Sequence, residues 1–234
     1  MLEEILRSGF EELGLPLEPQ ALERYRTYYE YLEEINRVMN LTAISGEADV
    51  ARLHFLDCAA LLKLADFPGK RLIDVGTGAG FPGLALKIAC PETDVTLLDS
   101  LDKRIGFLRA LCEKLALPEV RCVHLRAEEA PKDYRESYDM AVSRAVARLN
   151  LLSELCLPLV KPGGLFIAMK GPDVEAELQE AERAVALLGG QIERTALYTV
   201  PGTDVTHSAV LIRKLSPTPA KYPRRWAQIK SKPL

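Results

Sequence analysis

The apolar residues of this chain follow two different spacings. In the first third they recur every three or four positions, as in Leu2, Ile5, Leu6 and Phe10, which predicts amphipathic helices. A second such stretch at 21–39 contains several tyrosines, which we interpret as a packing face and not as a surface on which bases stack.

Beyond the first third, short apolar runs alternate with helical patterns, which is typical of a parallel sheet whose strands are joined by helices. We expect strands at residues 71–76, 95–100, 120–126, 138–144, 164–170, 191–200 and 208–215. We expect helices between them at 82–90, 102–116, 146–160 and 173–188. The last two strands follow each other like a hairpin. The pattern predicts an α/β fold, a doubly wound, seven-stranded and mostly parallel sheet preceded by helices.

The chain of 234 residues is long enough for one domain with an appendage. We divide it into an N-terminal helical extension at 1–66 that packs on the core, a Rossmann-like domain at 67–216 and a basic tail at 217–234. The tail contains four prolines and is expected to be extended.

Composition restricts the class of protein. Hydrophobic residues make up 48% of the chain and charged residues 27%, the balance of an ordinary soluble enzyme. No apolar run reaches the roughly 18 residues of a membrane span, and the acidic N-terminus lacks the layout of a signal peptide. The five cysteines show no C-x-x-C spacing, which indicates reduced thiols and no zinc site. We therefore expect a cytoplasmic protein with no membrane partner and no metal. We also expect it to be a monomer.

The charge is distributed unevenly. The net charge is −3, but from Val205 onward there are seven basic residues and no acidic ones, which leaves 23 basic and 33 acidic residues before that point. A body this acidic does not bind nucleic acid through its overall charge, whereas a local basic patch can bind phosphates. The tail is therefore either an RNA-binding segment or a solvated end that keeps the protein soluble.

A glycine-rich loop, DVGTGAGFPG, follows the first expected strand at 74–83. Read from Gly78 it spells G-x-G-x-x-G, the fingerprint of dinucleotide-binding proteins. Read from Gly76 it spells D-x-G-x-G-x-G, the loop of S-adenosylmethionine-dependent methyltransferases. Both readings predict a cofactor with an adenosine part at the carboxyl ends of the strands, where a doubly wound sheet binds its ligands.

Two residues of the loop favour the second reading. The carboxylate of Asp74 would repel a pyrophosphate, but it suits a donor that carries an ammonium and a sulfonium. Pro82 removes one of the N–H groups with which a helix N-terminus binds a pyrophosphate. Asp99, at the end of the second strand, could accept the ribose hydroxyls of either cofactor. Ala127 and Glu128 follow the third strand, where we expect an adenine ring and its amine, although a carboxylate that only favours a helix start is the alternative. We favour S-adenosylmethionine over NAD.

The fourth strand ends in SRAVARLN, which bears on the methyl acceptor. The segment has neither the Asn/Asp-Pro-Pro-aromatic turn that holds an amine nor a Pro-Cys nucleophile for a cytosine carbon. A ring nitrogen such as guanine N7 already has an in-plane lone pair and needs mainly positioning and desolvation. Arg144 could hold guanine O6 or a phosphate, or form an ordinary strand-end ion pair. Lys170 could likewise hold RNA or be merely solvated.

Six segments of the chain occur in an order that is known from one family. They are NLTAI (40–44), HFLD (54–57), DVGTGAGFPG (74–83), SRAVA (143–147), MKG (169–171) and KYPRR (221–225). From about residue 36 to its end, the chain resembles the bacterial 16S ribosomal RNA guanine-N7 methyltransferases, also called glucose-inhibited division protein B. The resemblance implies a Rossmann-like class I methyltransferase that converts S-adenosylmethionine to S-adenosylhomocysteine. It also implies that the acceptor is N7 of one guanine in the 530 loop of the decoding region, within 16S rRNA, the small ribosomal subunit or an assembly intermediate.

The motifs and the resemblance together nominate the functional residues. The expected donor-binding residues are Asp74, Gly76, Gly78, Gly80, Phe81, Asp99, Ser100, Leu101, Ala127, Glu128 and Arg144. The catalytic candidates are Arg144 and Lys170, and the RNA-binding candidates are Arg144, Lys170, Lys221, Arg224, Arg225, Lys230 and Lys232. The chain departs from the family at Cys58, where Ser is common, and at Ala227 and Ile229, where Gly and Pro are usual.

Two residues and three other functions stay open at this point. His54 and Asp57, three positions apart on one helix, either contact RNA, cap the donor pocket or form buried hydrogen bonds. His124 and His207 are expected to be ordinary strand residues. The alternative functions are a small-molecule methyltransferase, an NAD-dependent oxidoreductase and a non-catalytic RNA-binding module.

Overall fold

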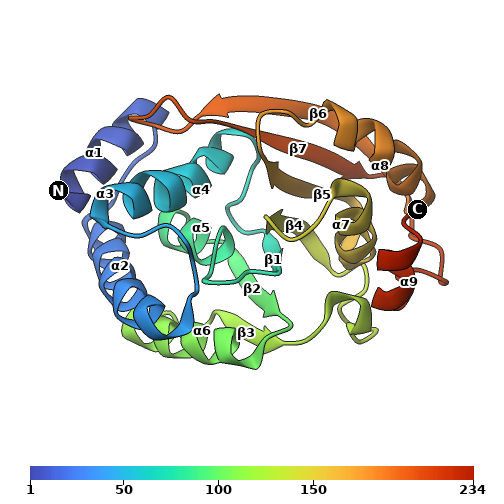
Figure 1. The fold of residues 1–234 in the computed structure, drawn as a ribbon, viewed down its shortest axis with the longest axis horizontal. Helices are drawn as coiled ribbons and strands as arrows, with labels where there is room; N and C mark the ends of the chain where they lie inside the picture. The colour runs from blue at the N-terminus through green and yellow to red at the C-terminus, as the bar shows by residue number, and fades with distance from the viewer.

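A seven-stranded sheet runs through the centre of the computed structural model, which describes residues 1–234 (Figure 1). The strands are β1 (Arg71–Val75), β2 (Asp94–Asp99), β3 (Arg121–His124), β4 (Tyr138–Arg144), β5 (Val160–Lys170), β6 (Gly190–Thr199) and β7 (Thr206–Lys214). Their order is β3-β2-β1-β4-β5-β7-β6, and β7 runs antiparallel to both of its neighbours. The seven predicted strands and the hairpin of the last two are confirmed. Strand β5 begins earlier than expected, at Val160, which pairs with Tyr138 of β4.

Helices cover both faces of the sheet, which is therefore doubly wound, as predicted. The helices between the strands are α5 (Gly83–Ala89) and α6 (Asp102–Lys114) on one face, with α7 (Leu149–Cys156) and α8 (Glu175–Leu187) on the other. The N-terminal elements are α1 (Leu2–Leu13), α2 (Pro19–Met39), α3 (Glu47–Val50), the π-helical η1 (Ala51–Leu56), α4 (Asp57–Ala59) and η2 (Ala60–Lys63). Two further short 3₁₀ turns are η3 (Ala127–Glu129) and η4 (Leu157–Leu159). No helix of the chain combines the length and the apolar character that a membrane crossing requires.

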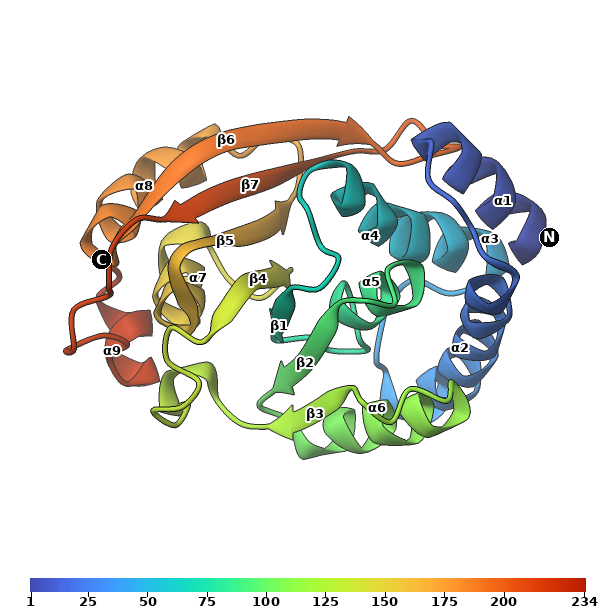
Figure 2. The same cartoon turned by 180° about the vertical axis from the view of Figure 1, so that it is seen from behind.

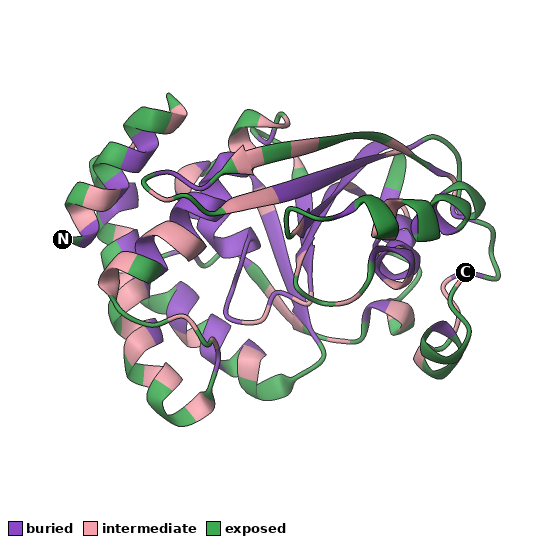
Figure 3. Ribbon diagram, turned by 45° about the horizontal axis from the view of Figure 1, so that its top comes forward, coloured by how far each residue is buried: buried purple, intermediate pink, exposed green.

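The sheet separates two hydrophobic cores, because successive side chains of a strand point to opposite faces. Leu72 of β1 and Leu97 of β2 belong to the larger core, together with the N-terminal helices, α5 and α6. The next residues along each strand, Ile73 and Leu98, belong to the smaller core with α7 and α8. Figure 3 shows the central strands buried and the outer sides of the helices exposed.

The tyrosines of α2 pack inward, as predicted. Tyr25 and Tyr28 are fully buried in the larger core. The Tyr25 hydroxyl donates a hydrogen bond to the carbonyl of Ala85 (2.9 Å), and the Tyr28 hydroxyl donates one to the carbonyl of Ala79 (2.6 Å). Helix α2 therefore contacts both α5 and the glycine loop. The division of the chain at residues 66 and 216 stays a prediction.

The C-terminal tail is folded, so the prediction of an extended segment is wrong. Helix α9 (Trp226–Ser231) forms in the stretch without proline between Pro223 and Pro233. Its Ile229 is fully buried in the smaller core, and so, nearly, is Tyr222 ahead of the helix. The prolines thus bound a short helix and do not prevent one.

Candidate functional site

The glycine loop connects β1 to α5 and requires glycine at several positions. Gly76, Gly78 and Gly80 have φ angles of 73°, 60° and 103°, a region that residues with a Cβ rarely adopt. A Cβ at Gly76 would lie 2.5 Å from a methyl group of Val146, and one at Gly80 would collide with the Tyr28 hydroxyl. The sequence of the loop is therefore dictated by backbone conformation and by close approach of α2 and the segment after β4.

Asp74 supports the loop from inside. Its side chain is fully buried, and its Oδ2 accepts hydrogen bonds from the Thr77 hydroxyl (2.7 Å) and from the backbone N–H of Gly83 (2.8 Å). Burial raises the pKa of Asp74 to about 6. Because Gly83 is the first residue of α5, the N-terminus of this helix is directed at Asp74 and not at a ligand phosphate. This arrangement argues against the dinucleotide reading, because the Gly83 N–H that a pyrophosphate would use already donates to Asp74.

Asp99 fixes the other side of the loop. It is buried at the end of β2, where its Oδ2 accepts a hydrogen bond from the backbone N–H of Gly78 (2.9 Å) and its Oδ1 one from Leu101 (2.9 Å). The guanidinium of Arg104 lies 3.3 Å from Oδ2. A carboxylate has about four lone-pair positions, so Asp99 keeps some capacity to accept hydrogen bonds from hydroxyl groups.

A pocket of about 230 Å³ lies beside the loop, and we name it the Gly76 pocket. It is lined by Val75, Gly76, Leu98, Ser100, Leu125, Arg126, Ala127, Glu128, Val146, Leu155 and Trp226. Four residues that the sequence nominated meet here, namely Gly76, Ser100, Ala127 and Glu128. The side chain of Glu128 is only 6% exposed, and its nearest cation, Arg126, is 3.9 Å away. The pocket thus combines apolar walls with one poorly neutralised carboxylate.

A second pocket, of about 430 Å³, lies at the carboxyl end of β4, and we name it the Arg144 pocket. It is lined by Thr42, Leu53, His54, Asp57, Arg144, Ala145, Met169, Lys170, Gly171 and His207. The segments NLTAI, HFLD, SRAVA and MKG are far apart in the chain, yet each contributes residues to this one pocket.

Arg144 is the centre of the second pocket. Its Nη1 donates hydrogen bonds to the carbonyl of Leu53 (3.1 Å) and to Asp57 Oδ2 (3.2 Å). Its Nη2 donates to Nδ1 of His54 (2.8 Å). The guanidinium also lies over the ring of Phe81, 5.1 Å from its centroid. Arg144 is therefore held in one orientation by groups from η1, α4 and the glycine loop.

The contact with Arg144 determines the proton position on His54. A guanidinium can only donate, so Nδ1 of His54 is the acceptor and the ring is neutral with its proton on Nε2. Nε2 then donates to the hydroxyl oxygen of Thr42 (2.9 Å). In agreement, burial and the charge of Arg144 lower the pKa of His54 to about 3. Of the three roles considered for His54, the buried hydrogen-bonded histidine is the one observed, and it lies in the wall of the pocket.

The carboxylate of Asp57 accepts hydrogen bonds from three side chains that belong to different elements. Besides Arg144, its carboxylate accepts a hydrogen bond from the Tyr198 hydroxyl (2.9 Å) and one from Nδ1 of His207 (2.8 Å). The hydrogen bond and the negative charge of Asp57 raise the pKa of His207. The expectation that His207 is an ordinary strand residue is therefore wrong, because its imidazole forms part of a charged cluster in the pocket.

The segment after β4 contributes to both pockets. Ala145 lines the Arg144 pocket and the next residue, Val146, lines the Gly76 pocket. Ala145 has a φ of 56°, a left-handed conformation that is uncommon for alanine and turns the chain between the two pockets. The turn after β4 therefore lies between the two pockets and contributes one residue to each.

Comparison with known proteins agrees with this arrangement. The family model described as "rRNA small subunit methyltransferase G" matches residues 21–201. The chain belongs to this family. A relative named ribosomal RNA small subunit methyltransferase G, from Alkaliphilus oremlandii, is 47% identical over 100% of this chain and 99% of its own length. The protein of the same name from Alkaliphilus metalliredigens is 45% identical over 98% of both chains.

Solved structures identify the fold class. TrmN from Thermus thermophilus matches with a TM-score of 0.53 and 25% identity. The match covers 68% of this chain and 48% of TrmN. A 16S rRNA (adenine(1408)-N(1))-methyltransferase variant from Catenulisporales acidiphilia matches with a TM-score of 0.52 and 18% identity over 69% of this chain and 93% of its own. The fold is therefore that of the Rossmann-like, S-adenosylmethionine-dependent methyltransferases. The chain is an rRNA methyltransferase by family, as its motifs predicted.

Several nominated residues do not line either pocket. Phe81 is buried, with its ring stacked between those of Tyr28 (5.1 Å between centroids) and His54 (4.2 Å). Asp74, Gly78, Gly80 and Asp99 shape the loop as described above. Leu101 is 43% exposed next to Asp99 and could reach a ligand from outside. Direct contacts of these residues with a methyl donor stay predictions.

Lys170, at the end of β5, is already engaged. Its ammonium donates hydrogen bonds to the carbonyl of Ala147 (2.7 Å) and to Glu177 of α8 (2.7 Å), and its side chain is 11% exposed. Two of its three donors are thus used to hold the turn after β4 against α8. A contact with RNA through the third donor stays a prediction.

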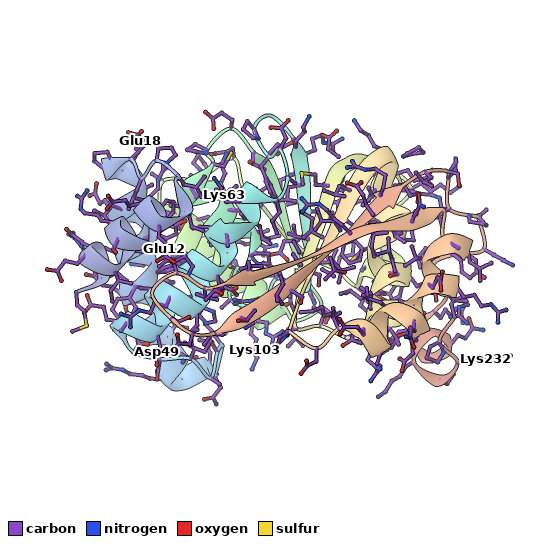
Figure 4. All side chains as sticks on the ribbon, turned by 90° about the horizontal axis from the view of Figure 1, so that it is seen from above. Glu12, Glu18, Asp49, Lys63, Lys103 and Lys232 are labelled. Carbon is purple, nitrogen blue, oxygen red and sulfur yellow. The ribbon has the colours of Figure 1, made fainter.

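The tail cations fall into two groups. Arg224 forms an ion pair with the buried carboxylate of Glu154 on α7 (2.6 Å), so most of its donors are used inside the protein. Four other basic residues of the tail are exposed and form no ion pair: Lys221, Arg225, Lys230 and Lys232. Figure 4 shows Lys232 at the end of the molecule opposite to the acidic Glu12, Glu18 and Asp49. The positive charge of the tail is thus not neutralised by the N-terminal helices.

Proposed function

We propose that the protein transfers a methyl group from S-adenosylmethionine to N7 of one guanine in the 530 loop of bacterial 16S rRNA. The main support is the Arg144 pocket, in which four separated segments of a member of the rRNA methyltransferase G family assemble beside the glycine loop. Free rRNA, an assembly intermediate and the small subunit are the substrates to compare.

The Gly76 pocket would hold the adenosine part of the donor. Glu128 offers a carboxylate for the adenine amine, and Asp99 has acceptor capacity for the ribose hydroxyls. The methionine part would lie toward the loop, where Oδ1 of Asp74 is buried without a hydrogen-bond partner. An unsatisfied buried carboxylate oxygen is costly, and a nearby ammonium group would lower that cost.

The Arg144 pocket would hold the guanine. S-Adenosylmethionine would supply an electrophilic methyl group on a cationic sulfur; the lone pair of N7 would form the new N–C bond as the C–S bond breaks and S-adenosylhomocysteine leaves. The protein therefore needs no general base, and its contribution is to orient the base and exclude water. Arg144, Lys170 and His207 carry N–H donors that suit the neighbouring O6 and the RNA phosphates. We accordingly propose that the reaction needs no metal ion, and that the protein works as a cytoplasmic monomer on its RNA.

The test is transfer of a labelled methyl group to small-subunit RNA, followed by borohydride–aniline cleavage at 7-methylguanine. We expect a single cleavage site in the 530 loop. Arg144→Lys keeps the charge but loses the fixed fork of donors, and should reduce transfer by about 100-fold or more. Arg148→Ala, which removes an exposed ion pair with Glu180 outside both pockets, is the matched control and should leave transfer unchanged.

The same experiment tests the alternative of a small-molecule methyltransferase. That alternative predicts donor binding without label in RNA at any stage of subunit assembly. Label at several unrelated guanines, or on an atom other than N7, would also contradict the proposal. Absence of donor binding by calorimetry would exclude both forms of methyltransferase.

A further inference from the structure

The Gly76 pocket has a wall that no motif predicted. Trp226, the first residue of α9, lines it together with Gly76, Ala127 and Glu128. It is the only aromatic residue in the lining and the only tryptophan of the chain. The C-terminal tail, which the sequence analysis considered only as an RNA-binding segment or a solvated end, therefore reaches the pocket on the side where an adenine ring is expected.

The tail is anchored firmly enough to hold Trp226 in place. Arg224 donates hydrogen bonds to both carboxylate oxygens of Glu154, which is 1% exposed. Arg135 donates to the carbonyls of Thr218 (2.5 Å) and Tyr222 (2.7 Å) just ahead of α9. Ile229, one turn after Trp226, is fully buried. Figure 2 shows α9 on the same side of the sheet as α7 and α8, which agrees with these contacts.

We propose that Trp226 is a donor-binding residue whose indole forms the aromatic wall for the adenine base of S-adenosylmethionine. The proposal rests on the proposed function, because it assigns the adenosine part of the donor to the Gly76 pocket. Every nucleobase has a π-face that an aromatic side chain can stack on, and the other walls of this pocket are aliphatic or polar. Glu128 would accept a hydrogen bond from the adenine amine at the edge of the ring, and the indole of Trp226 would stack on the face of the adenine ring.

The C-terminal tail would then have two roles. Because α9 carries both Trp226 and exposed cations such as Lys230, the tail serves the donor pocket as well as RNA. Deletion of residues 217–234 is then expected to weaken donor binding even without RNA. Loss of activity on that deletion would therefore not distinguish an RNA substrate from a small-molecule substrate.

The sole tryptophan provides a direct test that does not depend on methyl transfer. Titration of the full-length protein with S-adenosylhomocysteine should change the emission of Trp226, with the same dissociation constant that calorimetry gives. Trp226→Leu should weaken binding about fivefold or more, whereas Trp226→Phe should retain most of the affinity. Gln228→Ala, on the exposed side of α9, is the control and should bind like the wild type.

The outcomes separate the two proposals. If S-adenosylhomocysteine binds but Trp226 emission does not change and Trp226→Leu binds normally, the assignment of Trp226 is wrong and the proposed function stands. Equal affinities of the Leu and Phe variants, both weakened, would show that the indole matters for packing of the tail and not as an aromatic wall. If the wild type binds no S-adenosylhomocysteine at all, both proposals fail.

Discussion

Arg144 and Asp57 form a buried ion pair, with Nη1 of the arginine 3.2 Å from Oδ2 of the aspartate. Asp57 is fully buried, and the side chain of Arg144 is 18% exposed. The pair joins the end of β4 to α4, although the two residues are far apart in the sequence. It therefore links the N-terminal helices to the strand end at which the proposed chemistry takes place.

Replacement of Asp57 by Asn should destabilise the protein strongly. The substitution leaves the buried guanidinium of Arg144 without its counter-charge, and breaking such a pair typically costs about 3–5 kcal/mol. The measurement is the free energy of unfolding in urea. Asp94→Asn is the control, because Asp94 pairs with Arg121 at the surface, where an ion pair is worth about 1 kcal/mol or less. Equal effects of the two substitutions would contradict the structural role of Asp57.

The fold was predictable because the central strands can be recognised from the sequence. The strands β1, β2 and β4 each contain a short apolar run at 72–73, 97–98 and 140–142, as expected of strands buried on both faces, and helical patterns separate them. The glycine loop was predictable from its backbone, since residues with a Cβ rarely adopt the φ angles of Gly76 and Gly80.

The charged cluster was predictable only in part. The segments HFLD and SRAVA identified His54, Asp57 and Arg144 as candidates, but nothing in either segment shows that these side chains contact one another. His207 was missed because one histidine in a strand is not a motif. The period of two along β7 does assign it to the same face as Ala209 and Leu211, which the N-terminal helices cover.

The tail could not be predicted because its helix has only six residues and is flanked by prolines. Such a helix forms through tertiary contacts, here the burial of Ile229 and the ion pair of Arg224 with Glu154. Neither contact has a local signature, and the role of Trp226 depends on both.

His54 should make the protein sensitive to mild acid. The pKa of His54 is about 3 in the folded protein, below its ordinary value near 6.5, because the ring is buried and next to Arg144. Below about pH 6.5, His54 therefore binds a proton in the unfolded chain but stays neutral in the folded protein. The free energy of unfolding consequently decreases as the pH falls. The loss attributable to His54 is about 1.4 kcal/mol per pH unit at most.

The variant His54→Gln isolates this effect. It removes the titration while it keeps one donor and one acceptor for Thr42 and Arg144. Urea unfolding of both proteins between pH 7 and pH 5 should show the wild type losing stability relative to the variant. A difference that does not change with pH would mean that His54 is not a buried neutral histidine.

Two glycines should respond oppositely to replacement by alanine. Gly76→Ala introduces a side chain at a φ of 73° and within 2.5 Å of Val146, so we expect lower stability and loss of S-adenosylhomocysteine binding. Gly106→Ala lies in the exposed middle of α6 with no atom near its added methyl group, and should stabilise the protein by about 0.5–1 kcal/mol. Thermal unfolding and calorimetry measure the two effects. Normal binding by Gly76→Ala would contradict the proposed place of the donor.

Two adjacent arginines of the tail should separate folding from RNA binding. Arg224→Ala leaves the buried carboxylate of Glu154 unpaired and should lower the unfolding temperature, weaken the docking of α9 and thereby weaken donor binding. Arg225→Ala removes an exposed cation that forms no ion pair, so it should leave the unfolding temperature and donor affinity unchanged.

If Arg225 contacts a phosphate, its loss should weaken RNA binding and reduce the slope of log affinity against log salt by about 1. Filter binding to small-subunit RNA at several salt concentrations measures that slope. An unchanged slope for Arg225→Ala, together with a normal unfolding temperature for Arg224→Ala, would contradict both roles, because the pairing with Glu154 is what distinguishes the two residues.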